Sequence, residues 1–369
     1  MKVAIMTFVR AYNYGAVLQA YALNKAINDI GVECQTIDYY PKAFRNSYSL
    51  RNHCVLRLKP AKNPKWWVLN NLLCLRVKKR NKKFSGFLKK HFRMTKKQFC
   101  NANELETCLN FDVYISGSDQ VWNPEICGFD KAFFLTFCKD KKKISYAASF
   151  GINEIPKEYK QEFIKRLSGW NAYSVREPSG VEIINDLVGE RAECHCDPTF
   201  LLSSQDWVSS LSIKKRKEEY ILVYIVDESD ALLNYAYQLS EQLGLKVYCL
   251  HSTMKPEYFR NKIDEYHITI VYAASPKEYL SYFLSANYIL TNSFHGTVFS
   301  VIFHKKFLCE SVSNGRADYL LQKLSLQNRV LNDSRIEKIF EEINWDSVEN
   351  RIKQLRDGGL SYLKSQIIE

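Results

Sequence analysis

The chain alternates between short apolar runs and longer stretches in which apolar residues recur at helical spacing. Residues 2–8 (KVAIMTF) predict a first strand, and residues 16–31 predict the helix that follows and ends at Gly31. Residues 32–40 alternate between apolar and polar like a second strand. The chain therefore opens with a β–α–β unit, which favours a parallel sheet with a right-handed crossover.

The same pattern occurs twice along the chain. Short strands are predicted at residues 111–119, 143–151 and 172–177, and a second strand–helix series begins at residues 218–226. We predict an α/β fold with two Rossmann-like domains in tandem. The first covers residues 1–205 with a basic helical insertion at about 41–103, the second covers residues 206–345, and a C-terminal helix covers residues 346–369.

The positive charge is concentrated in the insertion. Eighteen Lys and Arg residues, and no Asp or Glu, lie between Asp38 and Glu104, which exceeds the net charge of +12 for the whole chain. Such a segment attracts polyanions. Trp66, Trp67 and several leucines are interleaved with the basic residues, as in an interfacial amphipathic helix. Contact with an anionic membrane surface and a solvated helix face both fit this pattern better than nucleic-acid binding does.

Length and composition limit the class of protein. The 369 residues are long for one core, and 46% of them are hydrophobic, as in an ordinary globular protein. We expect neither a membrane-spanning helix nor a cleaved signal peptide before the first strand. Eleven cysteines without regular spacing favour a reduced, cytoplasmic protein over a disulfide framework.

Polar clusters follow many of the predicted strands. In open parallel sheets, ligands bind outside the carboxyl ends of the strands, so two facing halves would form one cleft. The first cluster contains Asn13 and Gly15, placed before a helix where amide groups favour an anion or a sugar hydroxyl. This turn is not a dinucleotide fingerprint, and a structural role is the alternative. Gln19 fits either the edge of a core or a ligand contact.

Residues 116–124 (SGSDQVWNP) combine a carboxylate, amides and an indole. Gln120, Trp122 and Asn123 suit a carbohydrate, because an aromatic ring stacks on sugar C–H groups while amides bind hydroxyls. Asp119 is a candidate acid or base. A helix N-cap followed by a core tryptophan is the alternative.

Arg176 and Glu177 follow another strand. A guanidinium binds a carboxylate or a phosphate through paired hydrogen bonds, although an internal Arg176–Glu177 pair also fits. Cys194, His195 and Cys196 lack a second ligand pair at zinc spacing, so no metal site is predicted.

Residues 289–307 (ILTNSFHGTVFSVIFHKKF) place His295 between a strand and an apolar helix. Asn292 and Ser293 place polar side chains next to it in the sequence, and Gly296 leaves the turn without a bulky side chain. The histidine is therefore either a reacting group or a packed one. Arg316 begins an amphipathic segment, as an anion-binding residue or as an exposed arginine.

Several of these segments, in this order, resemble the polysaccharide pyruvyl transferase family. The matching segments span residues 3 to about 330: NYGAVLQAYAL, SGSDQVWNP, SYAASFG, SVRE with DPTFLL, TNSFHGTVFSVIF, and GRADYLL with LQNRV. Singly each motif is modest, and the ordered set is specific.

The resemblance implies a fold like that of GT-B glycosyltransferases and a transfer reaction without a cofactor. The enolpyruvyl group of phosphoenolpyruvate would move onto a sugar and form a cyclic pyruvate ketal across two hydroxyls. Arg176 and His295 match family residues, with donor binding implied for the arginine and phosphate stabilisation or proton transfer for the histidine. The general acid is left open among Asp119, Glu177 and His295.

One position departs from the family pattern. Several members carry Arg-Leu-His where this chain has Ser293, Phe294 and His295. The donor-binding cation at position 293 is therefore missing, and Arg316 or a lysine such as Lys305 is expected to replace it.

The resemblance also bears on partners. Similar proteins act on repeats of cell-surface polysaccharides (capsule or exopolysaccharide), some carried on undecaprenyl pyrophosphate. The basic insertion would then hold the enzyme at the inner membrane face. Two rival functions are a GT-B glycosyltransferase that uses a nucleotide sugar, and a non-catalytic carbohydrate- or polyanion-binding protein.

Overall fold

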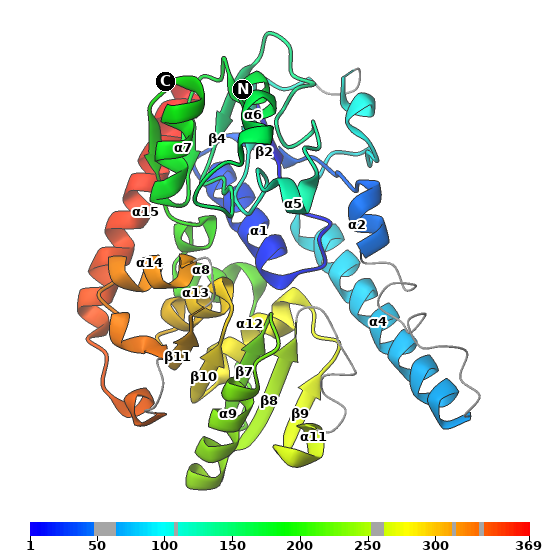
Figure 1. Cartoon of the computed structure of the whole chain (residues 1–369), viewed down its shortest axis with the longest axis vertical. Coiled ribbons are helices and arrows are strands. Elements are labelled where there is room, and N and C mark those ends of the chain that lie inside the picture. Colours follow the sequence, from blue (N-terminus) through cyan, green and yellow to red (C-terminus); the bar gives the residue numbers. More distant parts are fainter. Residues whose placement is uncertain (48–63, 107–109, 252–261, 312–314, 332–335) are drawn as a thin grey trace.

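Two parallel sheets form the framework of the chain. A computed structural model describes residues 1–47, 64–106, 110–251, 262–311, 315–331 and 336–369. Figure 1 shows two α/β halves, one above the other, with the C-terminal helix running along the side of both. In the described ranges no helix is both long enough and apolar enough to cross a membrane.

The first sheet is built from the N-terminal half. Its strand order is β2-β1-β3-β4, with β2 at Glu33–Thr36, β1 at Lys2–Met6, β3 at Val113–Ser116 and β4 at Lys142–Ser145. All pairs are parallel, and Ser116 at the end of β3 lies beside Met6 of β1 and Ser145 of β4. Single bridges connect β4 and the residues after it to β5 (Tyr173–Val175), which pairs with β6 (Ala192–Cys194).

The second sheet is built from the C-terminal half. Its strand order is β12-β11-β10-β7-β8-β9, again parallel. The strands are β7 (Tyr220–Ile225), β8 (Lys246–His251), β9 (Ile268–Val271), β10 (Tyr288–Thr291), β11 (Lys306–Glu310) and β12 (Val330–Leu331). Every residue of β7 is buried, as expected for a central strand covered by helices on both faces.

Helices connect and cover these strands. In the first half they are α1 (Tyr14–Asp29), α2 (Lys42–Ser47), α4 (Pro64–His91), α5 (Pro124–Cys127), α6 (Lys160–Leu167), α7 (Pro178–Val188) and α8 (Ser204–Leu211). In the second half they are α9 (Asp230–Leu243), α11 (Lys262–Glu265), α12 (Pro276–Ser285), α13 (Phe294–Ile302), α14 (Arg316–Lys323) and α15 (Trp345–Ile368). Short 3₁₀ turns lie at 102–105, 157–159, 198–201, 327–329 and 336–340.

The final helix α15 returns to the first half. Leu363 and Ile367 are buried in one cluster with Val3 and Ile5 of β1, and the Tyr362 hydroxyl donates a hydrogen bond to the Ser145 carbonyl. The C-terminal residues therefore complete the core of the first sheet.

The two halves share a hydrophobic core cluster. Tyr14 at the start of α1 stacks on Tyr279 of α12 with ring centroids 4.5 Å apart, and its hydroxyl donates a hydrogen bond to the Ala274 carbonyl. Phe84 of α4 packs on the same Tyr14 ring. The start of α1, which carries the first polar cluster, is thus fixed against the second half.

The basic helix α4 contacts both halves. Its Arg80 is buried and donates to the Tyr12 carbonyl, and its Lys83 pairs with Glu278 of α12. Figure 1 shows the N-terminal end of α4 projecting away from the body. Residues 48–63 of the predicted insertion lie outside the described residues, as do the side chains of Trp66 and Trp67.

Candidate active site

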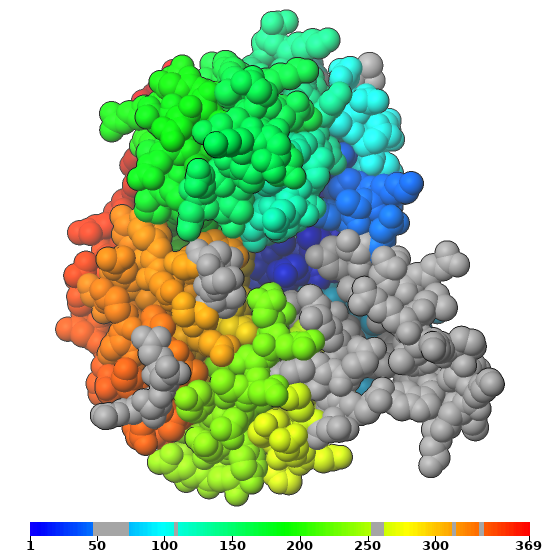
Figure 2. Space-filling view, in the orientation of Figure 1, coloured from blue at the N-terminus to red at the C-terminus, as the bar shows by residue number. Residues whose placement is uncertain are grey.

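The polar clusters at the strand ends meet in one cavity of about 150 Å³ between the two halves, called here the polar cavity. In Figure 2 the blue N-terminal segment lies recessed between the halves. The cavity is lined by residues from loops and helix starts of both halves: Asn13, Asp119, Gln120, Val226, Asp227, Asn292, Ser293, Phe294, His295, Arg316 and Ala317. Besides His295, six of the predicted site residues line this cavity: Asn13, Asp119, Gln120, Asn292, Ser293 and Arg316. Gly15 is not among the lining residues, but it lies against the His295 ring.

His295 lies in the first turn of α13, where it meets the start of α1. A Cβ atom added to Gly15 would lie 2.1 Å from His295 Nδ1, so only glycine leaves room for this imidazole. On its other side, His295 Nε2 lies 3.5 Å from Asp197 Oδ2. Gly15 therefore accommodates His295, and its contact with the sugar acceptor stays a prediction.

Asp197 is the centre of the site, although its position in the DPTFLL segment did not mark it as a site residue. Its side chain is 0% exposed and pairs with Arg176 Nη1 at 3.0 Å as well as with His295. The amide and hydroxyl of Thr199 donate to its other oxygen. The available signal was an acidic residue three positions after the end of β6, because polar residues that follow other strands were already predicted to be site residues.

The charge of Asp197 is stabilised by its neighbours. Burial alone raises the pKa of the Asp197 carboxyl, but the charges of His295 and Arg176 outweigh this effect. The pKa of Asp197 therefore lies well below its usual range. The carboxylate remains ionised and gives His295 a buried counter-charge.

Arg176 follows β5 and is almost fully buried. Its Nε donates to Glu177 Oε1 at 2.8 Å, and its Nη1 donates to Asp197. Burial alone would lower the pKa of Arg176, but the negative charges of Glu177 and Asp197 raise it by more, so the net shift of the pKa is upward. The internal pair with Glu177 is therefore present, and Nη2 is buried without a hydrogen-bond partner among the residues that the structure describes.

Glu177, a candidate acid, is held by two donors. Its Oε1 accepts hydrogen bonds from Arg176 Nε and from the Ser149 hydroxyl at 3.0 Å. It lines a second cavity rather than the polar cavity. We conclude that Glu177 orients Arg176.

Arg316 is the first residue of α14 and lines the polar cavity. Among the described residues it forms no ion pair, and its Nε is buried without a partner. Burial lowers the pKa of Arg316, and the nearby charge of Arg176 lowers it further. A half-buried cation in a cavity, with one buried nitrogen and no ion pair among the described residues, suits the binding of an anion.

Lys305, the other expected replacement cation, lies elsewhere. It follows the far end of α13 and lines neither of the two cavities. Burial and the neighbouring Lys215 lower its pKa to about 8.

Three residues around His295 shape the backbone. Ser293 caps α13 by accepting a hydrogen bond from the Gly296 amide, and a Cβ on Gly296 would lie 2.2 Å from Thr291 Oγ1. The Asn292 side chain accepts from the Val226 amide and donates to the Asp227 carbonyl. Asn292 borders the cavity, but its side-chain amide is already hydrogen-bonded to the backbone of the protein. The geometry therefore favours a structural role for Asn292, Ser293 and Gly296 over direct binding of the donor substrate.

In the first half, two predicted acceptor contacts are also structural. Gln19 is 0% exposed and donates to Thr7 and to the Ala16 carbonyl, so it belongs to the core rather than to a ligand site. Asn13 caps α1 through Oδ1, which accepts from Gly15 and Ala16 amides, while its side chain still borders the polar cavity.

The segment after β3 contributes some residues to the polar cavity and others to the core. Asp119 adopts a left-handed backbone conformation (φ 76°) and lines the cavity with Gln120. Asn123 is buried as the cap of α5 and donates to Gln120 Oε1. Trp122 is 0% exposed and packs on Phe150 and Trp170. The prediction that Trp122 stacks on a sugar was wrong, because the helix cap turns the indole inward.

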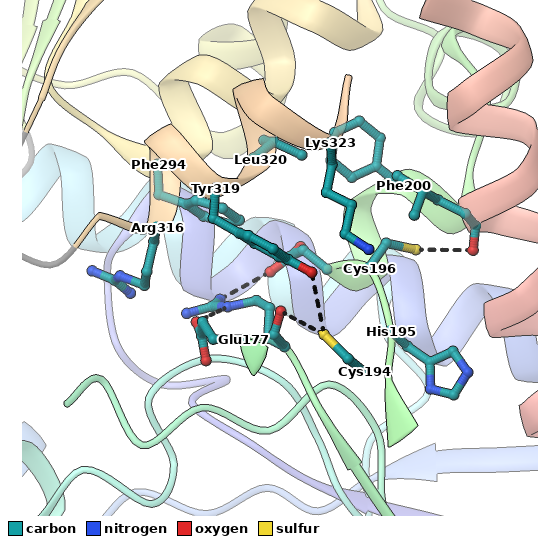
Figure 3. Close-up of a pocket in the computed structure, with 13 residues that line it drawn as sticks. Glu177, Cys194, His195, Cys196, Phe200, Phe294, Arg316, Tyr319, Leu320 and Lys323 are labelled. Carbon is teal, nitrogen blue, oxygen red and sulfur yellow. Dashed lines mark hydrogen bonds and ion pairs between the residues drawn. The ribbon is translucent and has the colours of Figure 1, made fainter. Parts of the chain in front are cut away.

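A second cavity of about 40 Å³ adjoins the first and shares Phe294 and Arg316 with it. Figure 3 shows Tyr319 and Lys323 of α14 facing Cys194 and Cys196. The Cys194 thiol lies 3.8 Å from the Tyr319 hydroxyl. Burial raises the pKa of the Cys194 thiol.

His195, which follows β6, is a packed residue. His195 Nδ1 lies 2.9 Å from the Ser174 hydroxyl, and its ring packs on Tyr146 and Tyr362. In the ranges that the structure describes, no group of three or more His, Cys, Asp or Glu is arranged to hold a metal ion.

The fold has the two parallel α/β halves of GT-B-like proteins. The UDP-GlcNAc 2-epimerase of Neisseria meningitidis bound to UDP-GlcNAc is similar, with a TM-score of 0.51 and 9% identity over 100% of both chains. A putative UDP-N-acetylglucosamine 2-epimerase from Listeria monocytogenes has a TM-score of 0.50 and 10% identity, covering 99% of this chain and 90% of that chain. At these identities the similarity concerns the fold alone.

The chain belongs to the polysaccharide pyruvyl transferase family, whose model matches residues 13–314. It is therefore a transferase of polysaccharide biosynthesis. No curated protein matches the chain.

The contact between Gly15 and His295 leads to a first prediction. In Gly15→Ala, the new Cβ forces the imidazole to move by about 1 Å or more to reach normal contact, which breaks its pairing with Asp197. The NMR signals of the His295 ring are expected to shift strongly. Gly86→Ala is the matched control, because Gly86 is also helical and no atom lies within 4 Å of its added Cβ. Equal spectra for both variants would contradict the assignment.

The buried charge of Asp197 leads to a second prediction. Asp197→Asn leaves Arg176 and His295 without their shared counter-charge and is expected to lower the free energy of unfolding by about 3–5 kcal/mol at pH 7. Because the folded-state pKa is depressed, wild-type protein has this stabilisation above the unfolded-state value of about 4 and loses it as the pH falls further.

Urea denaturation at pH 7 and pH 3.5 measures this effect. The deficit of Asp197→Asn should be smaller at the lower pH. Asp357→Asn, an exposed position, should change stability by less than about 0.5 kcal/mol at both. A deficit that grows in acid would contradict the assignment.

Proposed function

We propose that the chain transfers the enolpyruvyl group of phosphoenolpyruvate to a sugar of a cell-surface polysaccharide precursor and forms a cyclic pyruvate ketal. The observation that carries the proposal is the unpaired Arg316 beside the Asp197–His295 pair, in a cavity between the halves of a pyruvyl transferase family member. This combination offers an anionic donor a cation and a proton-transferring group.

The proposed reaction balances without a redox partner. A proton adds to the methylene carbon of the donor and leaves an oxocarbenium-like carbon, to which one sugar hydroxyl adds. The C–O bond to phosphate then breaks, and the second hydroxyl closes the ring. Of the two hydroxyl protons released, one replaces the proton taken up by the methylene, and the other leaves with phosphate.

Each step has a candidate group in the polar cavity or in the second cavity beside it. We assign the proton transfer to His295, because Asp197 provides a counter-charge for its protonated form at 3.5 Å. Arg316 and the free Nη2 of Arg176 would bind donor anions. Asp119, Gln120 and Asn13 line the polar cavity from the first half. We assign to Asp119 the acceptance of a proton from the sugar hydroxyls, and to Gln120 and Asn13 further contacts with the sugar acceptor.

The basic helix α4 suggests where the enzyme binds its sugar acceptor. The exposed positions of α4 and the residues after it include many basic side chains: Arg76, Lys78, Lys79, Lys82, Lys89, Lys90, Arg93, Lys96 and Lys97. Leu75 on the same helix is 60% exposed. We propose that this surface contacts an anionic membrane from the cytoplasmic side, where a glycan linked to undecaprenyl pyrophosphate would be available.

The reaction is tested by incubation with phosphoenolpyruvate and a panel of galactosyl, mannosyl and N-acetylhexosaminyl acceptors. Phosphate release and a mass gain on one acceptor are expected. His295→Ala should lower the rate by about 10²- to 10⁴-fold, the usual contribution of general acid–base catalysis. His304→Ala is the matched control, because His304 follows the other end of the same helix and is exposed.

Other outcomes separate the rival functions. Thermal stabilisation by uridine or guanosine diphosphate but not by phosphoenolpyruvate would favour a glycosyltransferase. Glycan binding that His295→Ala leaves unchanged, without phosphate release on any acceptor, would favour a non-catalytic binding protein.

The membrane proposal has its own test. Substituting Lys78, Lys79, Lys82, Lys89 and Lys90 by Gln should weaken binding to phosphatidylglycerol vesicles by about 100-fold or more, since each basic residue near an anionic surface contributes about 1 kcal/mol. A control substitutes five exposed lysines of the first half: Lys131, Lys139, Lys141, Lys157 and Lys160. Equal losses in both variants at low salt would show a general charge effect and contradict a specific α4 surface.

A further inference from the structure

Asp227 is a second carboxylate of the polar cavity. It lies two residues after the end of β7, it is exposed, and it lines the cavity from the second half. Asp119 lines the same cavity from the first half, so each half contributes one carboxylate. Neither carboxylate forms an ion pair with another residue in the described part of the chain. Both are therefore available to a ligand in the cavity.

A buried amide holds the backbone of Asp227 in place. The Asn292 side chain accepts a hydrogen bond from the Val226 amide at 2.9 Å and donates one to the Asp227 carbonyl at 2.8 Å. Its nitrogen also donates to Glu310 Oε2 at 3.4 Å, and Glu310 Oε1 accepts a hydrogen bond from the Ser229 hydroxyl at 3.0 Å. The loop after β7 is therefore fixed at both Asp227 and Ser229.

The backbone and the carboxylate of Asp227 have different surroundings. The backbone carbonyl is bound by Asn292, which is only 5% exposed, whereas the carboxylate has no charged partner among the described residues. A carboxylate at a cavity wall accepts hydrogen bonds from water or from the hydroxyl groups of a ligand. A positioning role toward Asp227 accounts for the buried polar side chain of Asn292 at the end of β10.

The charges in the cavity indicate which ligand faces the two carboxylates. Arg316 and His295 suit the anionic donor, as assigned above. Asp119 and Asp227 would repel an anion at close range, but they accept hydrogen bonds from neutral hydroxyls. A ligand with two hydroxyl groups, such as the sugar acceptor, therefore suits the part of the cavity that these carboxylates line.

The proposed reaction also requires two proton acceptors or one that acts twice. Two C–O bonds form to the same donor carbon, and an O–H bond of the sugar breaks each time. A carboxylate accepts one proton at a time. A separate base for each hydroxyl removes the need to deprotonate a single base between the two additions.

We propose that Asp227 binds one hydroxyl of the sugar acceptor and takes its proton, and that it shares this role with Asp119, which serves the other hydroxyl. The phosphate leaves with the electron pair of the broken C–O bond and takes up one of the two protons, so atoms and charge balance. Asn292 is the positioning residue that holds Asp227. The proposal rests on the proposed function and adds a base from the second half.

Steady-state kinetics with phosphoenolpyruvate and the acceptor found in the panel test this role. Asp227→Asn is expected to raise the KM for the acceptor by about tenfold or more and to lower kcat by about 100-fold or more, because it removes a charged hydrogen-bond partner and a base. Binding of phosphoenolpyruvate alone, measured by calorimetry, should not weaken. Asp264→Asn is the matched control, because Asp264 is an exposed carboxylate of the second half that lines neither cavity.

Chemical rescue separates a base from a merely structural carboxylate. Asp227→Ala leaves space at an exposed position, and sodium formate supplies a carboxylate that accepts the proton in its place. Formate should raise the kcat of Asp227→Ala by about tenfold or more and leave wild-type protein and Asp264→Asn unchanged. Asn292→Ala keeps the carboxylate but releases the loop, so it should lower kcat without any response to formate.

The failures of the two proposals are distinguishable. If wild-type protein transfers pyruvyl groups, then unchanged kinetics in Asp227→Asn, or no response of Asp227→Ala to formate, would overturn the inference and leave the proposed function intact. Inactivation of wild-type protein by a chelator, with recovery in Mg²⁺, would assign the carboxylates to a metal ion and also overturn it.

If no acceptor yields phosphate release, the proposed function fails and sugar binding becomes the test. Saturation-transfer NMR with methyl galactoside, methyl mannoside and methyl N-acetylglucosaminide measures that binding directly. Weaker binding to Asp227→Asn than to Asp264→Asn would support the sugar contact of Asp227. Equal binding to both variants, or no binding to wild-type protein, would overturn it.

Discussion

The site depends on one buried carboxylate. Asp197 has no exposed surface, and such a group stays ionised only when cations and donors surround it. Arg176 supplies a cation from the same half, and His295 approaches from the other half through space that Gly15 leaves free. Because the Asp197 carboxylate interacts with both Arg176 and His295, the buried Arg176–Asp197 ion pair of the first half and the position of His295 in the second half depend on each other.

The general architecture could be predicted from the sequence, because parallel sheets require crossovers and leave polar clusters at their strand ends. The details of the site depend on burial, which local patterns do not reveal. Asp197 and Trp122 show this limit: an Asp–Pro pair is typical of a turn, and a Trp after polar residues is typical of a ligand platform. In the fold the first is the charged centre and the second is core.

The missing arginine at position 293 shows how sequence and structure complement each other. Comparison of motifs revealed that a cation was absent, but it left Arg316 and Lys305 as equal replacements. They are 23 and 12 residues from Ser293 along the chain, and distance along the sequence does not show which of them reaches the cavity. The topology does, because α13 carries Lys305 away from the cavity, whereas the chain returns through β11 to bring Arg316 back to it.

The packing between the halves explains why a dispersed set of residues can serve as one site. Tyr14, Phe84 and Tyr279 join the start of α1, the basic helix and α12 in a common core, and α15 ties the end of the chain to the first sheet. The separation of His295 and Asp197 is therefore set by apolar packing rather than by the ligand. A preorganised charge arrangement of this kind need not reorganise as charge develops on a bound substrate, which is the condition under which buried electrostatic groups are most effective in catalysis.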